Sequence, residues 1–321
     1  MQSRYERSCY LSSCDPPLMR AGVMLPDMPT TQHRASLQAA VGGLYTLHDE
    51  RTDTRVVVAP QRGAIVTSFR VAGRELLYMN SETLCDSSQN VRGGIPVLFP
   101  CPGKLTADTV TWAGRTGTDL KQHGFGRILD WNVLDSPPGS LLLEIQANVW
   151  TLPRYPWQFR AQLEYRLDQH TLGIHFRVEN HDSVPLPFAL GFHPYFYVKD
   201  VLEKAKVRIP SNATQAFDNV QKRVVPVSGF ELCQPEVDLH LLDHGQSQCS
   251  IELPDGARVQ MRGSEELKIW VVWTLEKKDF VCLEPWTAHP DALNTGDNAI
   301  QLQPGAAHEL HLDMEYFPPQ S

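Results

Sequence analysis

The 321-residue sequence lacks the patterns that identify membrane-spanning and nucleic-acid-binding proteins. No apolar run approaches the roughly 20 residues that a membrane helix requires. The chain has 29 basic and 37 acidic residues and a formal net charge of −8, whereas nonspecific binding to nucleic acid needs a basic surface. We therefore expect neither a membrane nor a nucleic acid as a partner.

The cysteines exclude a disulfide-framed domain and a Cys-x-x-Cys zinc site. Their number is odd, seven, and no two of them are spaced as Cys-x-x-Cys. This usage is typical of reduced thiols in a cytosolic protein. No apolar secretory signal is recognisable, so we predict a cytoplasmic protein with no metal.

The first 40 residues lack any apolar period. They are rich in Ser, Pro, Met and Arg and contain Cys9 and Cys14. A transit peptide would be poor in acidic residues, and Glu6, Asp15 and Asp27 count against one. We expect a loosely ordered extension over residues 1–40, or an overlong start, followed by one domain over residues 41–321.

Long amphipathic helices are also missing, and strand patterns take their place. Residues 159–167 alternate strictly between apolar and polar side chains, the period of two of a half-buried strand. Further strand-like runs are separated by short turns: 55–59, 64–71, 172–178, 251–253, 257–261, 268–274, 280–284 and 308–317. With 24 prolines and no repeat or linker, the chain is predicted to be all-β, an antiparallel sandwich or barrel in a single domain.

Two strand-like stretches present a titratable side chain in the same way. His193 lies in GFHPYF (191–196), and Glu284 ends the apolar run VCLEPW (281–286). A proline follows each residue and favours extended backbone for it. Neighbouring aromatic rings can face the CH surface of a sugar. The pair predicts an acid and a base converging from two strands, although a lone histidine in an aromatic run is more often a hydrogen-bonded structural residue.

Two glycine-rich turns carry arginines. Arg92 precedes paired glycines, which let a backbone approach a ligand, and Arg127 closes the run HGFGR, which begins at His123. Residues 91–127 contain five cations and two aspartates, a local charge of +3 in an acidic chain. The reversal of sign indicates an anion site, but solvated turns with unpaired cations give the same count.

Together these motifs resemble the aldose 1-epimerase (mutarotase) family over residues 44–317, and its bacterial, cyanobacterial-type and hexose-6-phosphate members most closely. Four motifs in the family's order carry the resemblance: RGGIPVLFP (92–100), HGFGR (123–127), GFHPYF (191–196) and LEPW (283–286). It implies a large antiparallel β-supersandwich, with a sugar bound in a groove on one concave face. It also implies no metal and no organic cofactor, and we expect a monomer or weak dimer acting on a sugar or sugar phosphate.

The resemblance assigns roles residue by residue. His193 matches the family's general acid and Glu284 its general base, while His123 and Arg92 match sugar-binding positions. Arg127 matches a position associated with phosphate in the hexose-phosphate branch. A weaker local match makes Asp238 a substrate-binding carboxylate. The chain departs from the family in having His-Pro-Tyr-Phe for His-Thr-Tyr-Phe and Pro-Trp after Glu284, which leaves the choice of substrate open.

The chemistry of anomer exchange requires such a pair. The C1–O5 bond of the sugar must break and re-form on the other face of C1, with one group taking the O1 proton and another protonating O5. Burial against Trp286 should raise the pKa of Glu284 toward neutrality, and His193 should titrate close to neutral pH. We expect the two side chains to face one groove, several ångströms apart and not directly hydrogen-bonded.

Two other functions compete with this hypothesis. A carbohydrate-binding sandwich without catalysis would have the aromatic groove but no need for a converging histidine and glutamate. A glycoside hydrolase or polysaccharide lyase is a further alternative, but a hydrolase normally uses two carboxylates, and Glu284 has no obvious acidic partner motif.

Overall fold

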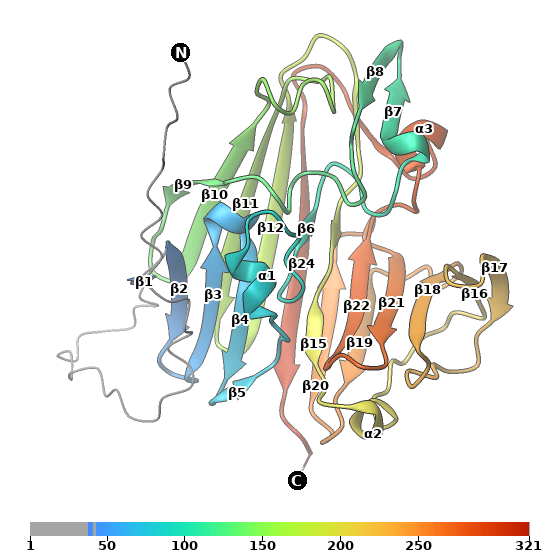
Figure 1. The fold of residues 1–321 in the computed structure, drawn as a ribbon. Helices are drawn as coiled ribbons and strands as arrows, with labels where there is room; N and C mark the ends of the chain where they lie inside the picture. The colour runs from blue at the N-terminus through green and yellow to red at the C-terminus, as the bar shows by residue number, and fades with distance from the viewer. Residues whose placement is uncertain (1–37, 41–42, 321) are drawn as a thin grey trace, which may run out of the picture.

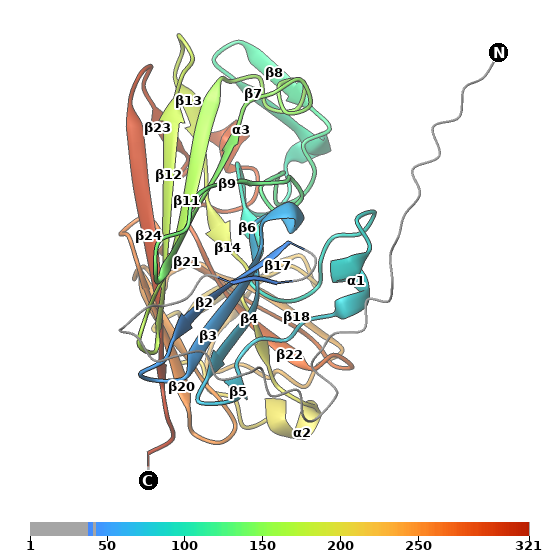
Figure 2. The same ribbon diagram turned by 90° about the vertical axis from the view of Figure 1, so that its left-hand side faces the viewer.

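The computed structural model describes residues 38–40 and 43–320, which form two layers of antiparallel β-sheet around a shared core. One layer is a seven-stranded sheet, and the other contains a five-stranded and an eight-stranded sheet side by side (Figure 1). Figure 2 views the layers nearly edge-on. The predicted all-β sandwich is thereby confirmed.

The seven-stranded sheet contains the longest strands of the described chain. In β11 the apolar residues of the two-residue period point into the core and the polar ones point outward, as the sequence predicted. The strands in spatial order are β19 (Gln248–Glu252), β20 (Arg258–Gly263), β24 (Ala307–Phe317), β12 (Thr171–Asn180), β11 (Phe159–Asp168), β10 (Ser140–Gln146) and β9 (Asn132–Asp135).

The opposing layer has two sheets joined by isolated bridges such as Val66 to Ile95 and Leu77 to Phe196. The five-stranded sheet runs β1 (Gln38–Ala40), β2 (Leu44–Asp49), β3 (Thr54–Ala59), β4 (Ile65–Val71), β5 (Arg74–Glu75). The eight-stranded sheet runs β17 (Arg223–Pro226), β16 (Gln215–Asp218), β18 (Glu236–Leu241), β21 (Ile269–Leu275), β22 (Phe280–Trp286), β14 (Gly191–Phe192), β6 (Val97–Leu98), with β15 (Tyr195–Tyr197) also paired to β22.

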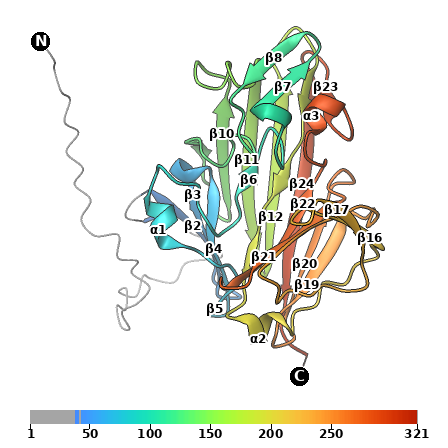
Figure 3. The same cartoon turned by 45° about the vertical axis from the view of Figure 1, so that its right-hand side comes forward.

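Short elements complete the described chain. Two small antiparallel sheets have two strands each: the hairpin of β7 (Thr109–Trp112) and β8 (Arg115–Thr118), and the pair of β13 (Leu186–Phe188) with the distant β23 (Ile300–Leu302). The α-helices are α1 (Ser81–Cys85), α2 (Val201–Lys204) and α3 (Ala292–Thr295), and the 3₁₀ turns are Pro60–Arg62 and Thr106–Asp108. Figures 1 and 3 place α3 beside β7 and β8, where the Asn294 side chain accepts from Thr111 N and donates to Thr109 O. No described helix exceeds two turns, as predicted.

Phe99 lies at the centre of the core between the two layers. Its fully buried ring contacts five other aromatic rings: Phe125, Tyr155, Phe159, Phe176 and Phe188. Phe159 and Phe176 come from the seven-stranded sheet, whereas Phe99 directly follows β6. This cluster therefore holds the segment of residues 92–100, which includes β6, against the opposite layer.

The expected N-terminal extension lies mostly outside the described residues. Residues 1–37 are not described, whereas Gln38–Ala40, which we placed in the extension, pair as β1 with β2. None of the described helices is long and apolar enough to cross a membrane.

Candidate active site

Strand β22 is covered on both faces. Val281 and Leu283 point into the core between the layers, while Cys282, Glu284 and Trp286 point to the other face of the eight-stranded sheet. That second face, called the site face below, carries two small apolar clusters. One is Leu98, Ile269, Val271 and Trp286, and the other contains Tyr195, Phe280 and Cys282. Glu284 lies between the two clusters and is 2% exposed.

His193 lies directly across from Glu284 in the sheet. β14 pairs Gly191 with Trp286 and β15 pairs Tyr195 with Cys282, so the residue midway between them is opposite Glu284. Pro194 has no N–H to give the ladder, and the strand is split at this point into β14 and β15. Opposite residues of an antiparallel pair direct their side chains to the same face. The predicted shared face is therefore confirmed.

The predicted separation of the two side chains is wrong. His193 Nε2 is 3.2 Å from Glu284 Oε1, in direct contact. The physical reason is the register, because Cβ atoms of directly opposite residues lie only about 4.5–5.5 Å apart. The second carboxyl oxygen, Oε2, accepts a hydrogen bond of 3.1 Å from the indole N–H of Trp286.

Burial disfavours the charged form of both members of the pair. It raises the pKa of Glu284 well above its usual value, an effect that the Trp286 hydrogen bond partly opposes. Burial, with added repulsion from Arg127 and Arg92, lowers the pKa of His193 to about 3. The expectation that His193 titrates near neutrality is therefore wrong. Both shifts favour the uncharged forms, a protonated carboxyl group and a neutral imidazole, over the ion pair.

Aromatic rings fix the plane of the His193 imidazole. Tyr195 stacks on it at 4.6 Å between centroids and 10° between planes, and Trp273 meets it edge-on at 5.6 Å. The backbone N–H of His193 donates to Pro96 O at 3.1 Å. The other ring nitrogen, Nδ1, is buried and has no hydrogen-bond partner. The ring is therefore positioned by packing and by Glu284 alone.

His123 approaches the pair from a tight turn. Its ring lies 5.8 Å from that of His193 and 5.7 Å from that of Trp286. The backbone N–H of Gly103 donates to His123 Nδ1 at 3.0 Å, so this nitrogen is unprotonated, and burial lowers the pKa of the ring well below its usual value. The turn needs Gly124, because a Cβ there would lie 2.2 Å from Phe99 O.

Arg127 lies half-buried beside this turn. One guanidinium nitrogen donates to Gln122 O at 2.9 Å, whereas Nε is buried and has no partner. Burial lowers the pKa of Arg127 to about 10, so it is still charged at neutral pH. Arg92 is exposed, with its guanidinium carbon 5.9 Å from the Trp273 ring centre. Among the described residues, neither arginine forms an ion pair.

The other cations behind the predicted local charge of +3 behave differently. Lys121 pairs with Asp108 and Asp119, and Arg115 pairs with Asp182 at 2.6 Å. These acidic partners offset part of the local positive charge. Of the three remaining cations, Lys104, Arg92 and Arg127, the two arginines of the glycine-rich turns are the ones that lower the pKa of His193.

A second histidine–carboxylate pair lies on the site face two strands from Glu284. Asp238 Oδ1 is 3.1 Å from His240 Nε2, and Asp238 Oδ2 accepts from Asn219 at 2.6 Å. The register places His240 in line with Val271 and Glu284, and its ring meets Trp286 edge-on at 5.2 Å. Sequence reasoning found Asp238 but missed His240, because an Asp-x-His pattern on a strand is ordinary and only the pairing of β18 with β21 brings it here.

Among the residues that the structure describes, one group of donor atoms could hold a metal ion. His193, Cys282 and Glu284 each offer a ligand atom, and these atoms lie within 4.8 Å of one another. Burial raises the pKa of the Cys282 thiol well above its usual value, so the thiol is protonated.

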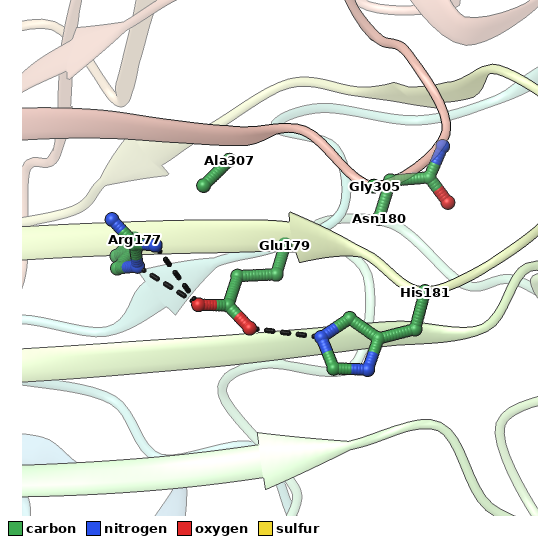
Figure 4. Close-up of a pocket in the computed structure, with 6 residues that line it drawn as sticks. All are labelled: Arg177, Glu179, Asn180, His181, Gly305 and Ala307. Carbon is green, nitrogen blue, oxygen red and sulfur yellow. Dashed lines mark hydrogen bonds and ion pairs between the residues drawn. The ribbon is translucent and has the colours of Figure 1, made fainter.

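Two hollows of the described surface lie elsewhere. Figure 4 shows one of about 420 Å³ at the end of β12, lined by Arg177, Glu179, Asn180, His181, Gly305 and Ala307. Its carboxylate, Glu179, is already paired with Arg177 and His181. The hollow lies on the outer face of the seven-stranded sheet and offers no uncommitted acid or base.

Comparisons with known proteins identify the family of the chain. The family model described as aldose 1-epimerase matches residues 44–315. The crystal structure of the Slr1438 protein from Synechocystis sp. PCC 6803 superposes with a TM-score of 0.81 at 32% identity, covering 90% of this chain and 99% of that one. A galactose mutarotase-like protein from Lactobacillus casei ATCC 334 shares the fold, with a TM-score of 0.67 at 22% identity over 86% of this chain and all of the other.

A curated relative in Cenchrus ciliaris, provisionally named a glucose-6-phosphate 1-epimerase, is 26% identical over 268 residues, covering 77% of this chain and 74% of its own. The region matched by the family model, residues 44–315, contains all four motifs and every site residue described above. The chain belongs to the aldose 1-epimerase family.

Proposed function

We propose that the protein interconverts the α and β anomers of an aldose, with Glu284 and His193 as the proton-transferring pair. The observation that carries the proposal is the 3.2 Å contact between a buried imidazole and a buried carboxyl group, directly opposite one another in the sheet. A purely structural pair would be expected to satisfy its polar atoms, whereas His193 Nδ1 has no partner.

The reaction needs one proton to leave and another to arrive. Glu284, as the carboxylate, takes the proton from O1 of the sugar, while the His193 imidazolium gives one to O5 as the C1–O5 bond breaks. Rotation about C1–C2 presents the other face of C1, and the two transfers then reverse. Since the pair holds a single mobile proton, each turnover returns it to its starting state.

The charges around the pair suggest how substrate sets these protonation states. In the described structure Arg127 and Arg92 add to burial in opposing a positive charge on His193. An anionic substrate group between these arginines would screen them and favour the imidazolium. The same group would therefore anchor the sugar and prepare the acid.

We propose that this anionic group is a phosphate and that the substrate is a hexose phosphate. A half-buried arginine with an unpartnered Nε and no ion-pair partner among the described residues has the donors that a phosphate oxygen requires. The provisional name of the Cenchrus ciliaris relative points to the same class. The alternative is that Arg92 binds ring hydroxyls of a free sugar while Arg127 is a solvated cation. The partial burial of Arg127 counts against its being a solvated cation.

The far edge of the sugar would meet Asp238. β21 separates β18 from β22, so Asp238 and His240 lie about two strand spacings, or roughly 10 Å, from the catalytic strand. This distance suits a pyranose ring with a hydrogen bond at each end. Hydrogen bonds from His240 and Asn219 keep the pKa of Asp238 low despite its burial, so it remains an acceptor for sugar hydroxyls.

The test is anomer exchange followed by NMR for glucose, galactose and glucose 6-phosphate, with and without protein. Native protein should accelerate exchange, and Glu284→Gln and His193→Asn should each slow it by about 10²–10⁴-fold while sugar binding is nearly unchanged. Each variant is compared with native protein by thermal unfolding. A folded native protein that binds sugar without accelerating exchange would be a carbohydrate-binding protein, and the proposal would fail.

A further inference from the structure

Cys282 has no part in the proposed reaction, yet its thiol lies against the catalytic pair. It follows the same face of β22 as Glu284, is completely buried, and is opposite Tyr195, the residue stacked on His193. Its sulfur and the donor atoms of His193 and Glu284 lie within 4.8 Å of one another. Three different metal-binding side chains therefore converge on one point.

The distances between these donor atoms suit an ion with tetrahedral coordination. Zinc binds histidine nitrogen at about 2.0–2.1 Å, carboxylate oxygen at about 2.0–2.2 Å and thiolate sulfur at about 2.3 Å, so neighbouring ligands of one ion stand roughly 3.3–3.7 Å apart. The 3.2 Å between His193 Nε2 and Glu284 Oε1 already matches one edge of that tetrahedron. The sulfur must move closer by no more than about 1.5 Å, less than a side-chain rotation provides.

A second observation points to a ligand here. His193 is more than nine-tenths buried, yet its Nδ1 has no hydrogen-bond partner, so only ring packing and Glu284 hold the imidazole in place. A structural zinc ligand would normally donate this N–H to a carboxylate or carbonyl group. The missing contact predicts a reversible site and not a permanently filled one.

We propose that His193, Cys282 and Glu284 form an inhibitory site for a thiophilic divalent cation such as Zn²⁺. On binding, the thiol loses its proton to become a thiolate, and the histidine–glutamate pair loses the proton it shares. The released protons go to solvent, and no electrons are transferred. Three protein ligands leave a fourth position for water. The binding is independent of the proposed function, whereas the inhibition rests on it.

Cobalt(II) is the probe for binding, since it accepts the same ligands as zinc and a thiolate–cobalt bond gives a near-ultraviolet charge-transfer band. Full-length reduced protein, freed of metal with a chelator, is titrated with Co²⁺. The native chain and Cys249→Ser should show the band, and Cys282→Ser should lose it. Cys249 is the control because its thiol is also buried in a strand but bonds to Pro210 O. A band that survives in Cys282→Ser comes from thiols elsewhere and overturns the proposal.

Activity supplies the second measurement. Zn²⁺ should inhibit anomer exchange by the native chain and by Cys249→Ser, chelator should restore it, and Cys282→Ser should be at least tenfold less sensitive. Cys282→Ala repeats the test if the serine variant unfolds. Equal sensitivity of all variants refutes inhibition at this site. If the native chain has no epimerase activity, the cobalt titration still decides whether the metal binds.

Discussion

Replacing Arg127 with alanine is the change that separates a phosphosugar enzyme from a free-sugar enzyme. The guanidinium now has one hydrogen bond, to Gln122 O, and no carboxylate partner, so its removal breaks no ion pair of the described fold. A charge-assisted hydrogen bond contributes about 1.5–3 kcal/mol. At about 1.4 kcal/mol per decade, the loss of one such bond should raise KM for glucose 6-phosphate roughly 10–100-fold. Free glucose, which has no phosphate, should be almost unaffected.

The assay is anomer exchange by NMR over a series of concentrations of each sugar. Arg154→Ala is the matched control, because Arg154 is a cation of the same region that pairs with Asp119 and packs over Trp150. Arg127→Lys keeps the charge but not the forked donors, and it should recover only part of the affinity. Equal losses for both sugars in Arg127→Ala, or faster turnover of unphosphorylated galactose by the native protein, would refute the phosphate assignment.

Three further predictions test other parts of the structure. Asp238→Asn should raise KM for phosphorylated and free sugars alike by about 10-fold with little change in kcat, because an amide is a weaker acceptor for hydroxyls; an unchanged KM in the NMR assay would remove Asp238 from the site. The Arg115 hydrogen bond, with backbone hydrogen bonds from Gln158 and Ser183, lowers the pKa of Asp182 from 3.8 to about 2. The Asp182 carboxylate therefore contributes about 2 kcal/mol to folding above pH 4, and this contribution is lost as pH falls toward 2. Urea unfolding of the native chain should show this loss, and Asp182→Asn should lack it. Phe99→Ala should lower the free energy of unfolding by about 3–5 kcal/mol. A loss below 1 kcal/mol would mean that neighbouring side chains move to fill the cavity that the ring leaves.

The strands could be predicted because their signal is local. The alternation over residues 159–167 is read from the side chains themselves, and β11 occupies Phe159–Asp168. That His193 and Glu284 share a face was also within reach, since a proline fixes each on extended backbone. The distance between the two side chains could not be predicted, because it depends on the register of β14 and β15 with β22, some ninety residues away in the chain.

The pKa shifts and the ion pairs could not be predicted from the sequence for the same reason. The pKa of His193 is lowered by burial that several separate strands and turns create together, and no neighbour in the sequence reveals it. The charge count over residues 91–127 could not show that Arg115 is neutralised by Asp182, a residue 67 positions away. Only the fold shows which two of the five cations face the site.

The break at Pro194 has an evolutionary consequence. Side chains of a strand alternate between faces, so one residue inserted or deleted between Gly191 and Tyr195 would turn His193 toward the core and away from Glu284. Arg92 and Arg127 are under no such restriction, because both lie in turns outside any strand. Lineages of this fold should therefore accept length changes in the turns that we propose to contact the substrate, and reject them around the proposed proton-transferring pair. New substrate preferences can then arise by remodelling those turns while the catalytic geometry is inherited unchanged.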